Sequence, residues 1–446
     1  MLKINIKKNI LSIIALICLS IIITTFIIIN KTKDPDLHNI NKNDIKKYSL
    51  DITGARDTSA SFQKMIDSYP SGSTVKLPKG TYSFQGTVKL KDGIKLITGG
   101  NVVIKGTGKN TLFSVGNDNS FQGIDFQNCA TAVNVTEKKG LVITDCRFTN
   151  NIDFAAINLS KASDCTVTNS YFYDIRKYGI LIDNNSSNIT INKNNFDNPK
   201  VFGGYAKEQI SGHVYSLNGT KISVTNNILK NSGGQGVIFG YNSTTGKGTT
   251  DSVASNNLCQ GNGQEGATIY GGDRKVTSGN SLINNNCKNN RFNQIEVWQA
   301  NDNIVKNNTV EESISGVGNL GAICLYDTNG TTVTGNKVLS SQTNGIDITA
   351  GSANCTITNN TITNTNLKND TKTVEKGNGI LLDSNGKSHP QHITIKNNKI
   401  SSGSGVIAKS GIYSTSNTNQ HNKIDSNTIT GYKNALHEYA KMTIEK

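Results

Sequence analysis

The sequence predicts an all-β protein whose short parallel strands coil into a solenoid. One phrase recurs along the chain: a branched apolar residue, an Asn three positions later and another apolar residue two positions after that, as in Val305–Val310, Ile357–Ile362 and Ile395–Ile400. Gly is abundant at 43 of 446 residues, and Pro is scarce at 5. The apolar residues alternate in short runs and show no helical periodicity. A repeat of this kind is typical of rungs that cover one another.

The first element is a run of apolar residues, Ile10–Ile29, that carries no charge and follows Lys3, Lys7 and Lys8. About twenty apolar residues span a bilayer as one helix, and the preceding lysines place the amino end inside. The run ends without the small residues of a cleavage site. This favours an uncleaved membrane anchor in residues 1–30 over a cleaved signal peptide.

A linker is predicted next. Residues 31–50 are rich in Lys, Asn and Asp and poor in large apolar residues, which predicts a flexible segment because little apolar surface is buried. The solenoid domain then comprises residues 51–446. We expect this domain to work on the extracellular face of the cell membrane or, if the anchor is cleaved, as a secreted protein.

A short helix is predicted at the start of the solenoid. Phe62, Met65 and Ile66 lie at helical spacing just after Thr58 and Ser59, two residue types that favour helix starts. An amphipathic helix at this point would cap the first rung and hide an edge that otherwise aggregates.

The repeats align on the last apolar residue of each phrase, the marker. Most intervals between consecutive markers measure 23 to 30 residues, which suits one turn of a solenoid. An inward-facing residue of the preceding strand lies five positions before each marker. The markers are Phe148, Phe172, Phe196, Leu229, Cys259, Cys287, Val310, Val338, Ile362, Ile400 and Ile429. The inward residues are Ile143, Val167, Ile191, Val224, Leu282, Val305, Val333, Ile357, Ile395 and Ile424.

An Asn stands two residues before most markers. We expect it at the sharp turn between two strands, because Asn tolerates the left-handed backbone better than other residues with a side chain. Its amide both donates and accepts, so the Asn side chains of successive rungs are predicted to bond to one another as a ladder. The ladder positions are Asn194, Asn227, Asn257, Asn285, Asn308, Asn336, Asn360, Asn398 and Asn427.

The entry segment resembles that of a known superfamily. Asp57-Thr58, Phe62–Asp67 and Gly72–Tyr82 are similar to the first rungs of pectate-lyase-like proteins, and with the Asn repeats the resemblance extends over residues 51–440. It implies a single-stranded right-handed parallel β-helix (solenoid) of about twelve rungs with a short N-terminal capping helix. Activity follows less directly, because the superfamily contains polysaccharide lyases, glycoside hydrolases, sugar epimerases, phage depolymerases and proteins without known catalysis.

Candidate site residues lie on the outward side of one strand per rung. Apolar pairs such as Ile295 and Val297 are expected to point inward, so the residues between and just after them point out. Tyr270, Trp298 and Tyr326 would then stack one per rung, with the only Trp of the chain at their centre. Sugar rings pack against aromatic faces of this kind. The predicted substrate-binding residues are Tyr270, Trp298, Gln299, Tyr326 and His213.

Carboxylates and a cation fall in the same rungs. Glycoside hydrolysis needs a proton donor and a second carboxylate across the bond, and Glu296 with Glu265 or Asp347 suits that chemistry. The predicted catalytic residues are Glu296, Glu265, Asp273, Arg274 and Asp347.

β-Elimination from a uronate is the second chemistry considered. It needs a cation to neutralise the sugar acid and a base to take a proton, and Arg274 with Tyr270 or His213 suits those roles. The formal net charge of +14 favours an acidic polysaccharide and therefore places a lyase slightly ahead of a hydrolase. The alternative is a non-catalytic surface adhesin or spacer that binds glycans. Nucleic acid is not expected as a partner.

The residue sets of characterised relatives are not retained. The Asp-Pro-His that the resemblance associates with mannuronan epimerases is reduced to Ser211-Gly212-His213. Of the polygalacturonase-type acids only Glu265 stays acidic. The rungs in question read Gly234-Gln235-Gly236, Gln264-Glu265-Gly266, Asn293-Gln294 and Gly321-Ala322.

Cysteine and histidine give no sign of a metal site. Cys259 and Cys287 occupy the marker column, and Cys165 and Cys355 an inward column, so we predict small buried hydrophobic residues rather than disulfides. The two histidines of residues 389–392 lack a third ligand nearby in sequence. A requirement for Ca²⁺ has no sequence signature and stays open, as does the oligomeric state, for which a trimer is one option.

Overall fold

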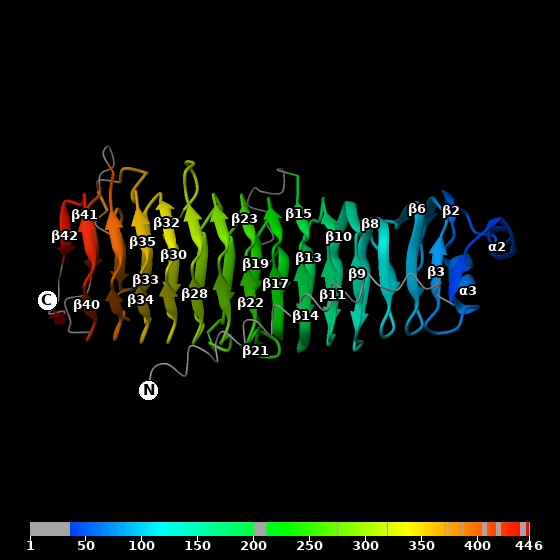
Figure 1. Ribbon diagram of the computed structural model, residues 1–446, viewed down its shortest axis with the longest axis horizontal. Helices are drawn as coiled ribbons and strands as arrows, with labels where there is room; N and C mark the ends of the chain where they lie inside the picture. Colours follow the sequence, from blue (N-terminus) through cyan, green and yellow to red (C-terminus); the bar gives the residue numbers. More distant parts are fainter. Residues whose placement is uncertain are drawn as a thin grey trace, which may run out of the picture. The chain divides into compact units, whose positions relative to one another are not determined.

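The computed structural model describes residues 36–199, 211–273, 275–318, 320–370, 372–373, 375–384, 386, 388–403, 408–415, 421–437 and 443–445. The chain divides into two units, Met1–His38 and Asn39–Lys446. In the second unit the strands pair in parallel, rung upon rung, from a helical end toward the carboxyl end (Figure 1). The predicted all-β parallel β-helix with an N-terminal capping helix is confirmed.

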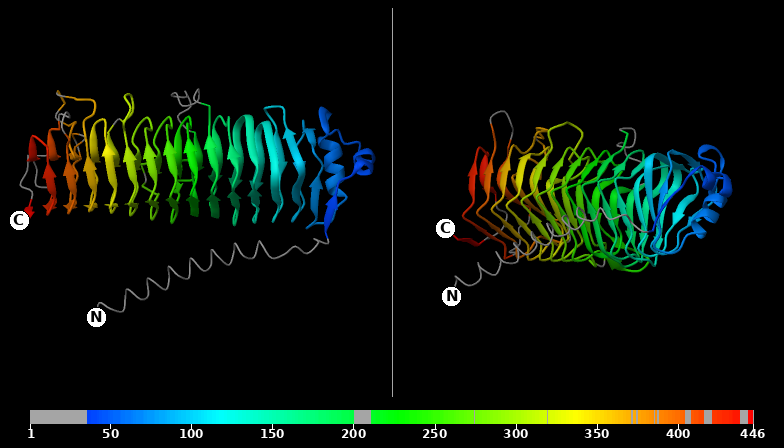
Figure 2. Two further views of the ribbon diagram at one scale, coloured as in Figure 1. Left: turned by 45° about the horizontal axis from the view of Figure 1, so that its top comes forward. Right: turned by 45° about the vertical axis from the view of Figure 1, so that its right-hand side comes forward.

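Each complete rung contributes one short strand to each of three faces (Figure 2). The first face holds β9 Val142–Thr144, β11 Thr166–Thr168, β14 Ser186–Asn192, β17 Gly219–Thr225, β22 Val253–Ser255, β25 Ser281–Ile283, β28 Ile304–Lys306, β31 Thr332–Thr334, β34 Thr356–Thr358, β37 Thr394–Lys396, β40 Lys423–Asp425 and β43 Thr443–Glu445. The second face holds β12 Tyr171–Phe172, β15 Asn195–Asp197, β18 Ile228–Lys230, β23 Leu258–Gln260, β26 Asn286–Lys288, β29 Thr309–Glu311, β32 Lys337–Ser340, β35 Thr361–Thr363, β38 Lys399–Ser401 and β41 Thr428–Thr430.

The third face carries the candidate site. Its strands are β13 Tyr178–Asp183, β16 Gly212–Ser216, β19 Gln235–Phe239, β24 Ala267–Tyr270, β27 Ile295–Trp298, β30 Gly321–Tyr326, β33 Asn344–Thr349, β36 Ile380–Asp383, β39 Ser410–Ser414 and β42 Asn434–His437. The long strand β10, Arg147–Ser160, continues from the second face onto the third. A small antiparallel hairpin, β20 Tyr241–Asn242 with β21 Lys247–Gly248, projects from this face between β19 and β22.

The amino-terminal end of the coil is closed by helix α3, Ser59–Asp67. Phe62, Met65 and Ile66 are completely buried, and the ring of Phe62 packs edge-on against Phe84 with 5.1 Å between ring centroids. The predicted cap is therefore confirmed. The remaining elements of this end are β1 Leu37–Asn39, β2 Thr53–Asp57, β3 Thr74–Leu77, β4 Gly80–Ser83, β5 Val88–Lys89, β6 Lys95–Lys105, β7 Thr111–Ser114 and β8 Ser120–Thr136.

The described part of the expected linker, residues 36–50, is folded, so the prediction of a flexible segment is wrong there. Residues Lys42–Tyr48 form helix α2, which begins with a capping box. The side chain of Asn41 accepts from the backbone N–H of Asn43 at 2.8 Å, and Asp44 accepts from that of Asn41 at 3.0 Å. Ile45 and Tyr48 pack against the core. A good cap and two apolar side chains stabilise this short helix.

The marker and inward columns are confirmed. Consecutive markers face one another in register, from Phe148 opposite Phe172 to Ile400 opposite Ile429. The inward column is continuous as well, and in the rung without a predicted member Ala254 takes the place between Val224 and Leu282. Each rung therefore adds the same apolar slice to one core that runs along the coil.

The Asn ladder is also confirmed. From Asn194 to Asn398 each side-chain Nδ2 donates to the Oδ1 of the Asn one rung further on, ending at Asn427, at 2.9 to 3.1 Å. The same Nδ2 also donates to a backbone carbonyl; for Asn308 this is the carbonyl of Leu282 at 2.8 Å. Every amide in the buried row is thus satisfied by its neighbours.

The left-handed turn lies one residue earlier than expected. The ladder residues are not among the described residues with positive φ, whereas the residue before each of them is, as at Asn307 (φ 55°) and Asn359 (φ 57°). Gly335 takes this place before Asn336, with φ 68°. The turn therefore explains the first Asn of each Asn-Asn pair, and the amide ladder explains the second.

The seven described cysteines are buried with free thiols, as predicted for Cys165, Cys259, Cys287 and Cys355. No group of described residues has the arrangement of a metal site. Among the described residues no helix is long and apolar enough to cross a membrane. The predicted anchor, Ile10–Ile29, lies outside them.

Candidate functional site

The third face presents two rows of outward side chains. The first row runs through the middle of each strand and the second through its end. Their members face one another in register, because these parallel strands pair without a shift at these positions. The first row is Leu181, Tyr215, Ile238, Thr268, Glu296, Cys324, Asp347 and Leu381. The second row includes Tyr270, Trp298, Tyr326, Thr349 and Asp383.

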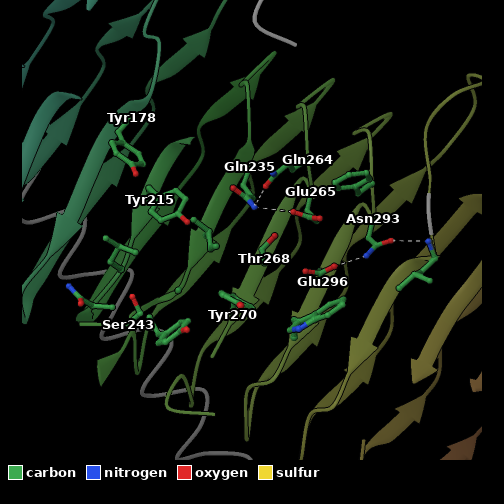
Figure 3. A pocket seen from close by; sticks show the side chains of 18 of the residues that line it. Tyr178, Tyr215, Gln235, Ser243, Gln264, Glu265, Thr268, Tyr270, Asn293 and Glu296 are labelled. Atoms are coloured by element: carbon green, nitrogen blue, oxygen red, sulfur yellow. Dashed lines mark hydrogen bonds between the residues drawn. The ribbon is translucent and has the colours of Figure 1, made fainter. Parts of the chain in front are cut away.

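A cleft of about 820 Å³ lies over this face, from β13 to β27 (Figure 3). Its floor is the first row from Tyr215 to Glu296, and its sides are formed by amide and aromatic side chains. One side is the hairpin β20–β21. The Nδ2 of Asn242 donates to both carboxylate oxygens of Asp183, at 2.9 and 3.2 Å, and this fixes the hairpin over the neighbouring rungs.

Two carboxyl groups meet in the cleft from neighbouring rungs. Glu296 projects from β27, and Glu265 lies just before β24; Figure 3 shows both turned toward the same space. Glu296 accepts from Asn293 Nδ2 at 2.7 Å, and Glu265 accepts from Gln235 Nε2 at 3.2 Å. The Glu265 carboxyl group also accepts from its own backbone N–H. Both carboxyl groups retain further acceptor positions for a ligand.

Burial makes ionisation of this pair unfavourable. Glu265 is 7% exposed and Glu296 is 8% exposed. Loss of hydration raises the pKa of Glu265 to about 7. It also raises the pKa of Glu296 well above its usual range, and the nearby charge of Glu265 adds to that rise. Burial thus favours the protonated form of Glu296, and Glu265 ionises near pH 7. Two carboxyl groups in different protonation states are what acid–base catalysis by such a pair requires.

Two further polar atoms of the lining lack a partner among the described residues. They are Oγ1 of Thr268, which lies opposite Glu296 in the strand register, and Oε1 of Gln235. Buried polar groups are almost always paired in folded proteins. A ligand that offers hydroxyl groups would satisfy both.

Aromatic rings line the cleft on either side of the carboxyl pair. Tyr178 and Tyr215 meet edge to face with 5.1 Å between centroids. Tyr270 meets Tyr241 of the hairpin in the same manner at 5.5 Å. Trp298 contributes the ring nearest to Glu296 in the second row.

Comparison with known proteins agrees with this architecture. A family profile described as "Right handed beta helix region" matches residues 82–250 and 246–429. The chain belongs to the right-handed β-helix family. A second profile, "Rhamnogalacturonase A/epimerase, pectate lyase-like", matches residues 43–101 at the capped end. The predicted membership of the pectate-lyase-like superfamily is confirmed.

Solved structures resemble this β-helix in fold. The A-module of mannuronan C-5 epimerase AlgE4 from Azotobacter vinelandii has a TM-score of 0.55 at 16% identity, covering 92% of this chain and 100% of that one. Gene product 12 of bacteriophage phi29 has a TM-score of 0.57 at 13% identity, with 89% and 56% covered. The catalytic domain of a GH87 alpha-1,3-glucanase in complex with tetrasaccharides has a TM-score of 0.50 at 11% identity, with 92% and 70% covered. No curated protein matches the sequence.

The β-helix brings four of the predicted site residues together. Glu265, Glu296, Tyr270 and Trp298 all line the cleft. Tyr326 lies behind Trp298, with stacked rings whose centroids are 3.7 Å apart, and is not part of the lining.

Other predicted residues lie at the rim or below the surface. Asp273 is exposed, and Gln299 Nε2 donates to it at 3.5 Å. Asp347 is two rungs beyond Glu296 and outside the lining, and its burial raises the pKa to about 8. Arg274 lies outside the described residues.

His213 does not reach the cleft, so its predicted role in substrate binding or as a base is not supported. The ring is 1% exposed and packs against Phe196, with 5.4 Å between centroids. Its Nε2 lies 2.6 Å from the carbonyl oxygen of Lys230 and donates to it. Burial lowers the pKa of His213 to about 4, so the imidazole is a neutral core group.

Sequence reasoning missed several residues of the lining. Tyr215 was overlooked because Ser216, where the pattern requires an apolar residue, hid the strand β16. Tyr178 begins β13 and stands before the apolar pair from which the outward positions of that strand were assigned. Tyr241 belongs to a hairpin that interrupts the repeat. The amides Gln235 and Asn293 precede or begin their strands and so fall outside the alternation of inward and outward positions.

Proposed function

We propose that this protein binds a polysaccharide in the cleft and hydrolyses a glycosidic bond with Glu265 and Glu296. The observation that carries the proposal is the carboxyl pair itself: two glutamates from adjacent rungs, both removed from water, on the floor of an aromatic cleft. Hydrolysis of a glycoside requires two such groups in different protonation states.

The lining suits a sugar. Tyr178, Tyr215, Tyr270 and Trp298 offer apolar ring surface against which the C–H face of a pyranose packs. The amides of Gln235, Gln264 and Asn293 offer donors and acceptors for hydroxyl groups.

In the proposed reaction Glu296 acts as the proton donor. It passes its proton to the glycosidic oxygen, the bond from that oxygen to the anomeric carbon breaks, and the electron pair stays on the leaving oxygen. The ionised Glu265 stabilises the positive charge that develops on the sugar ring. Water then adds its oxygen to the anomeric carbon. One of its protons stays on the new hydroxyl group, and the other passes to the carboxyl pair and replaces the proton that Glu296 gave up.

The described lining favours a neutral polysaccharide. It includes no lysine, arginine or histidine, so among these residues nothing neutralises a uronic acid. A carboxylate on the sugar would also meet the partly ionised glutamate pair. The overall charge of +14 led to the expectation of an acidic substrate and a lyase. The local chemistry of the cleft outweighs it, because exposed charges outside the cleft are screened over about 10 Å.

The direct test is product formation by the purified protein on neutral and acidic polysaccharides, with and without Ca²⁺. We expect new reducing ends from a neutral glycan, without the absorbance of unsaturated uronates. Glu296→Gln and Glu265→Gln should each lower the rate by at least about 100-fold. Absorbance from unsaturated uronates would contradict hydrolysis, and glycan binding without products from any substrate would indicate the non-catalytic alternative.

Glu312→Gln is the matched control. Glu312 is also completely buried, and burial raises its pKa to about 7, but it lies outside the cleft, held by Gln342 N–H at 2.8 Å. If this variant lost activity as fully as Glu296→Gln, loss of a buried carboxylate rather than of the cleft chemistry would be the cause.

We also propose that residues 1–30 anchor the protein and that the β-helix works outside the cell. The uncharged run Ile10–Ile29 behind three lysines supports this. If the β-helix lies outside the cell, protease added to intact cells should remove it. Protection of the β-helix until the cells are lysed would contradict this proposal.

A further inference from the structure

We infer that the cleft is closed beyond Glu296 and open at the opposite end, so that it binds the end of a glycan chain rather than its middle. This inference rests on the proposed function and adds an exo mode of action. It follows from three features: an open aromatic path at one end, and two walls at the other.

The open end lies toward the amino-terminal rungs. Beyond Tyr178 the surface continues to Phe154, which is 38% exposed and meets Tyr178 edge to face with 5.5 Å between centroids. Tyr178, Tyr215, Leu181 and Ile238 form one apolar cluster on this outer face. Among the described residues, an extended chain can thus leave the cleft over aromatic surface without meeting a wall.

The first wall at the other end is a pair of rings. Trp298 and Tyr326 lie parallel, with an interplanar angle of 8° and 3.7 Å between centroids. Tyr326 therefore covers one face of the indole, while Trp298 still lines the cleft. A sugar in the cleft meets the remaining part of Trp298 as its last contact.

The second wall is the segment before β30. Leu320 lines the cleft, and its backbone N–H donates to Asn293 Oδ1 at 3.3 Å. Gly318 N–H donates to the carbonyl of Arg291 at 3.0 Å, and Lys368 Nζ donates to the carbonyl of Gly318 at 2.8 Å. These bonds attach the wall to the preceding rung, through Arg291, and to the segment after β35, through Lys368.

The carboxyl pair lies at the closed end. In the first row Tyr215, Ile238, Thr268 and Glu296 line the cleft, whereas Cys324, the next member, does not. Glu296 is therefore the last residue of its row that a ligand reaches. Four rung steps of ~4.8 Å separate it from the rung of Tyr178, which leaves roughly 19 Å of floor on the open side. A bond cut at Glu296 would be close to a chain end.

The test measures binding to the Glu296→Gln variant, which keeps the cleft and removes turnover. Probes are oligosaccharide ladders of glucan, mannan, xylan and galactan, each free, blocked at the reducing end, or blocked at the non-reducing end. We expect one of the two blocks to weaken binding at least tenfold and the other to leave it unchanged. Equal binding of all three forms would overturn this inference alone. If no ladder binds, the proposed function fails and this inference with it.

Three aromatic variants locate the two ends. Trp298→Ala should weaken binding of free chains about tenfold and abolish the discrimination against blocked ends. Phe154→Ala should weaken binding of long chains and leave short ones unaffected. Tyr173→Ala is the control, because Tyr173 is also 38% exposed but follows the strand β12 of the second face. Loss of long-chain binding in Tyr173→Ala to the same degree would overturn the assigned path.

Discussion

At the residue scale, Glu265 and Glu296 owe their properties to what surrounds them. Glu137, by comparison, is exposed, and its ion pair with Lys161 at 2.7 Å lowers its pKa. In the cleft the same functional group has lost its water and gained an amide donor in place of an ion pair. The sequence indicated which residues are outward-facing acids, but which of them lose water depends on the walls of the cleft.

The pH dependence of the reaction should report this environment. Activity requires one proton on the pair, so the rate should rise as the first carboxyl group ionises and fall as the second does. Burial raises the pKa of Glu265 to about 7 and raises that of Glu296 well above its usual range. We expect a bell-shaped profile with its acidic limb near pH 7, and its two apparent pKa values belong to the pair. A rate optimum near pH 4.5 would show that the pair is solvated.

Asp347 offers a stability prediction. Burial raises its pKa to about 8, and its Oδ1 has no partner among the described residues. The folded state then binds more protons than the unfolded state between about pH 4 and pH 8, so the free energy of unfolding falls as pH rises through that range.

Asp347→Asn should remove this contribution and raise the free energy of unfolding at pH 8 by about 5 kcal/mol, with little effect at pH 4. Denaturant unfolding at both values measures it. A variant less stable than the parent at pH 8 would show that the ionised carboxylate is instead stabilised in the fold.

At the element scale, the rung is the unit that the sequence specifies. The marker, inward and ladder columns are each set by one residue type at a fixed spacing, and all three were predicted in register. The turn was predicted one residue too late. In each Asn-Asn pair the first residue forms the turn and the second forms the ladder, and the spacing of the repeat does not distinguish these two roles. Helix α2 and the hairpin β20–β21 were missed, since neither repeats.

A ladder Asn should contribute more to the free energy of unfolding than an exposed Asn does. Asn308 donates to Asn336 and Leu282 and accepts from Asn285 through both backbone and side-chain N–H groups, all at 2.8 to 3.0 Å. Asn308→Ala leaves these groups buried and unpaired, so we expect a loss of about 2 to 4 kcal/mol in the free energy of unfolding.

Asn286→Ala provides the comparison in the adjacent strand β26, because Asn286 is exposed. Its effect should stay within about 0.5 kcal/mol. If thermal or denaturant unfolding gave similar losses for the two variants, the ladder would not be the stabilising feature described here.

At the scale of the whole molecule, the repeated rungs form the face on which the site lies, and segments that interrupt the repeat form the walls of the cleft. Tyr270, Trp298, Glu265 and Glu296 were predicted because register alone places them together. The cleft itself arises from a hairpin on one side and the segment ending at Leu320 on another. Such insertions follow no period, so their position over the face could not be predicted.

Ionic strength separates the two substrate classes at this scale. The chain carries a net charge of +14, yet the described lining of the cleft has no basic side chain. Raising the salt concentration from 50 mM to 500 mM shortens the screening length from roughly 14 Å to roughly 4 Å. The affinity for a neutral glycan should therefore change less than about twofold. Calorimetry or fluorescence titration measures this. A steep loss of affinity would instead favour an acidic polysaccharide held by surface lysines.

The most direct test of the central claim is a crystal structure of the Glu296→Gln variant with an oligosaccharide that the parent hydrolyses or binds. The account predicts a glycosidic oxygen within hydrogen-bond distance of the side chain at position 296. That oxygen should not contact Trp298 or Leu320. The account also predicts Glu265 beside the same sugar and the chain running over Tyr215 toward Tyr178. A glycan seated elsewhere on the β-helix, with the cleft left free, would contradict the assignment of this site.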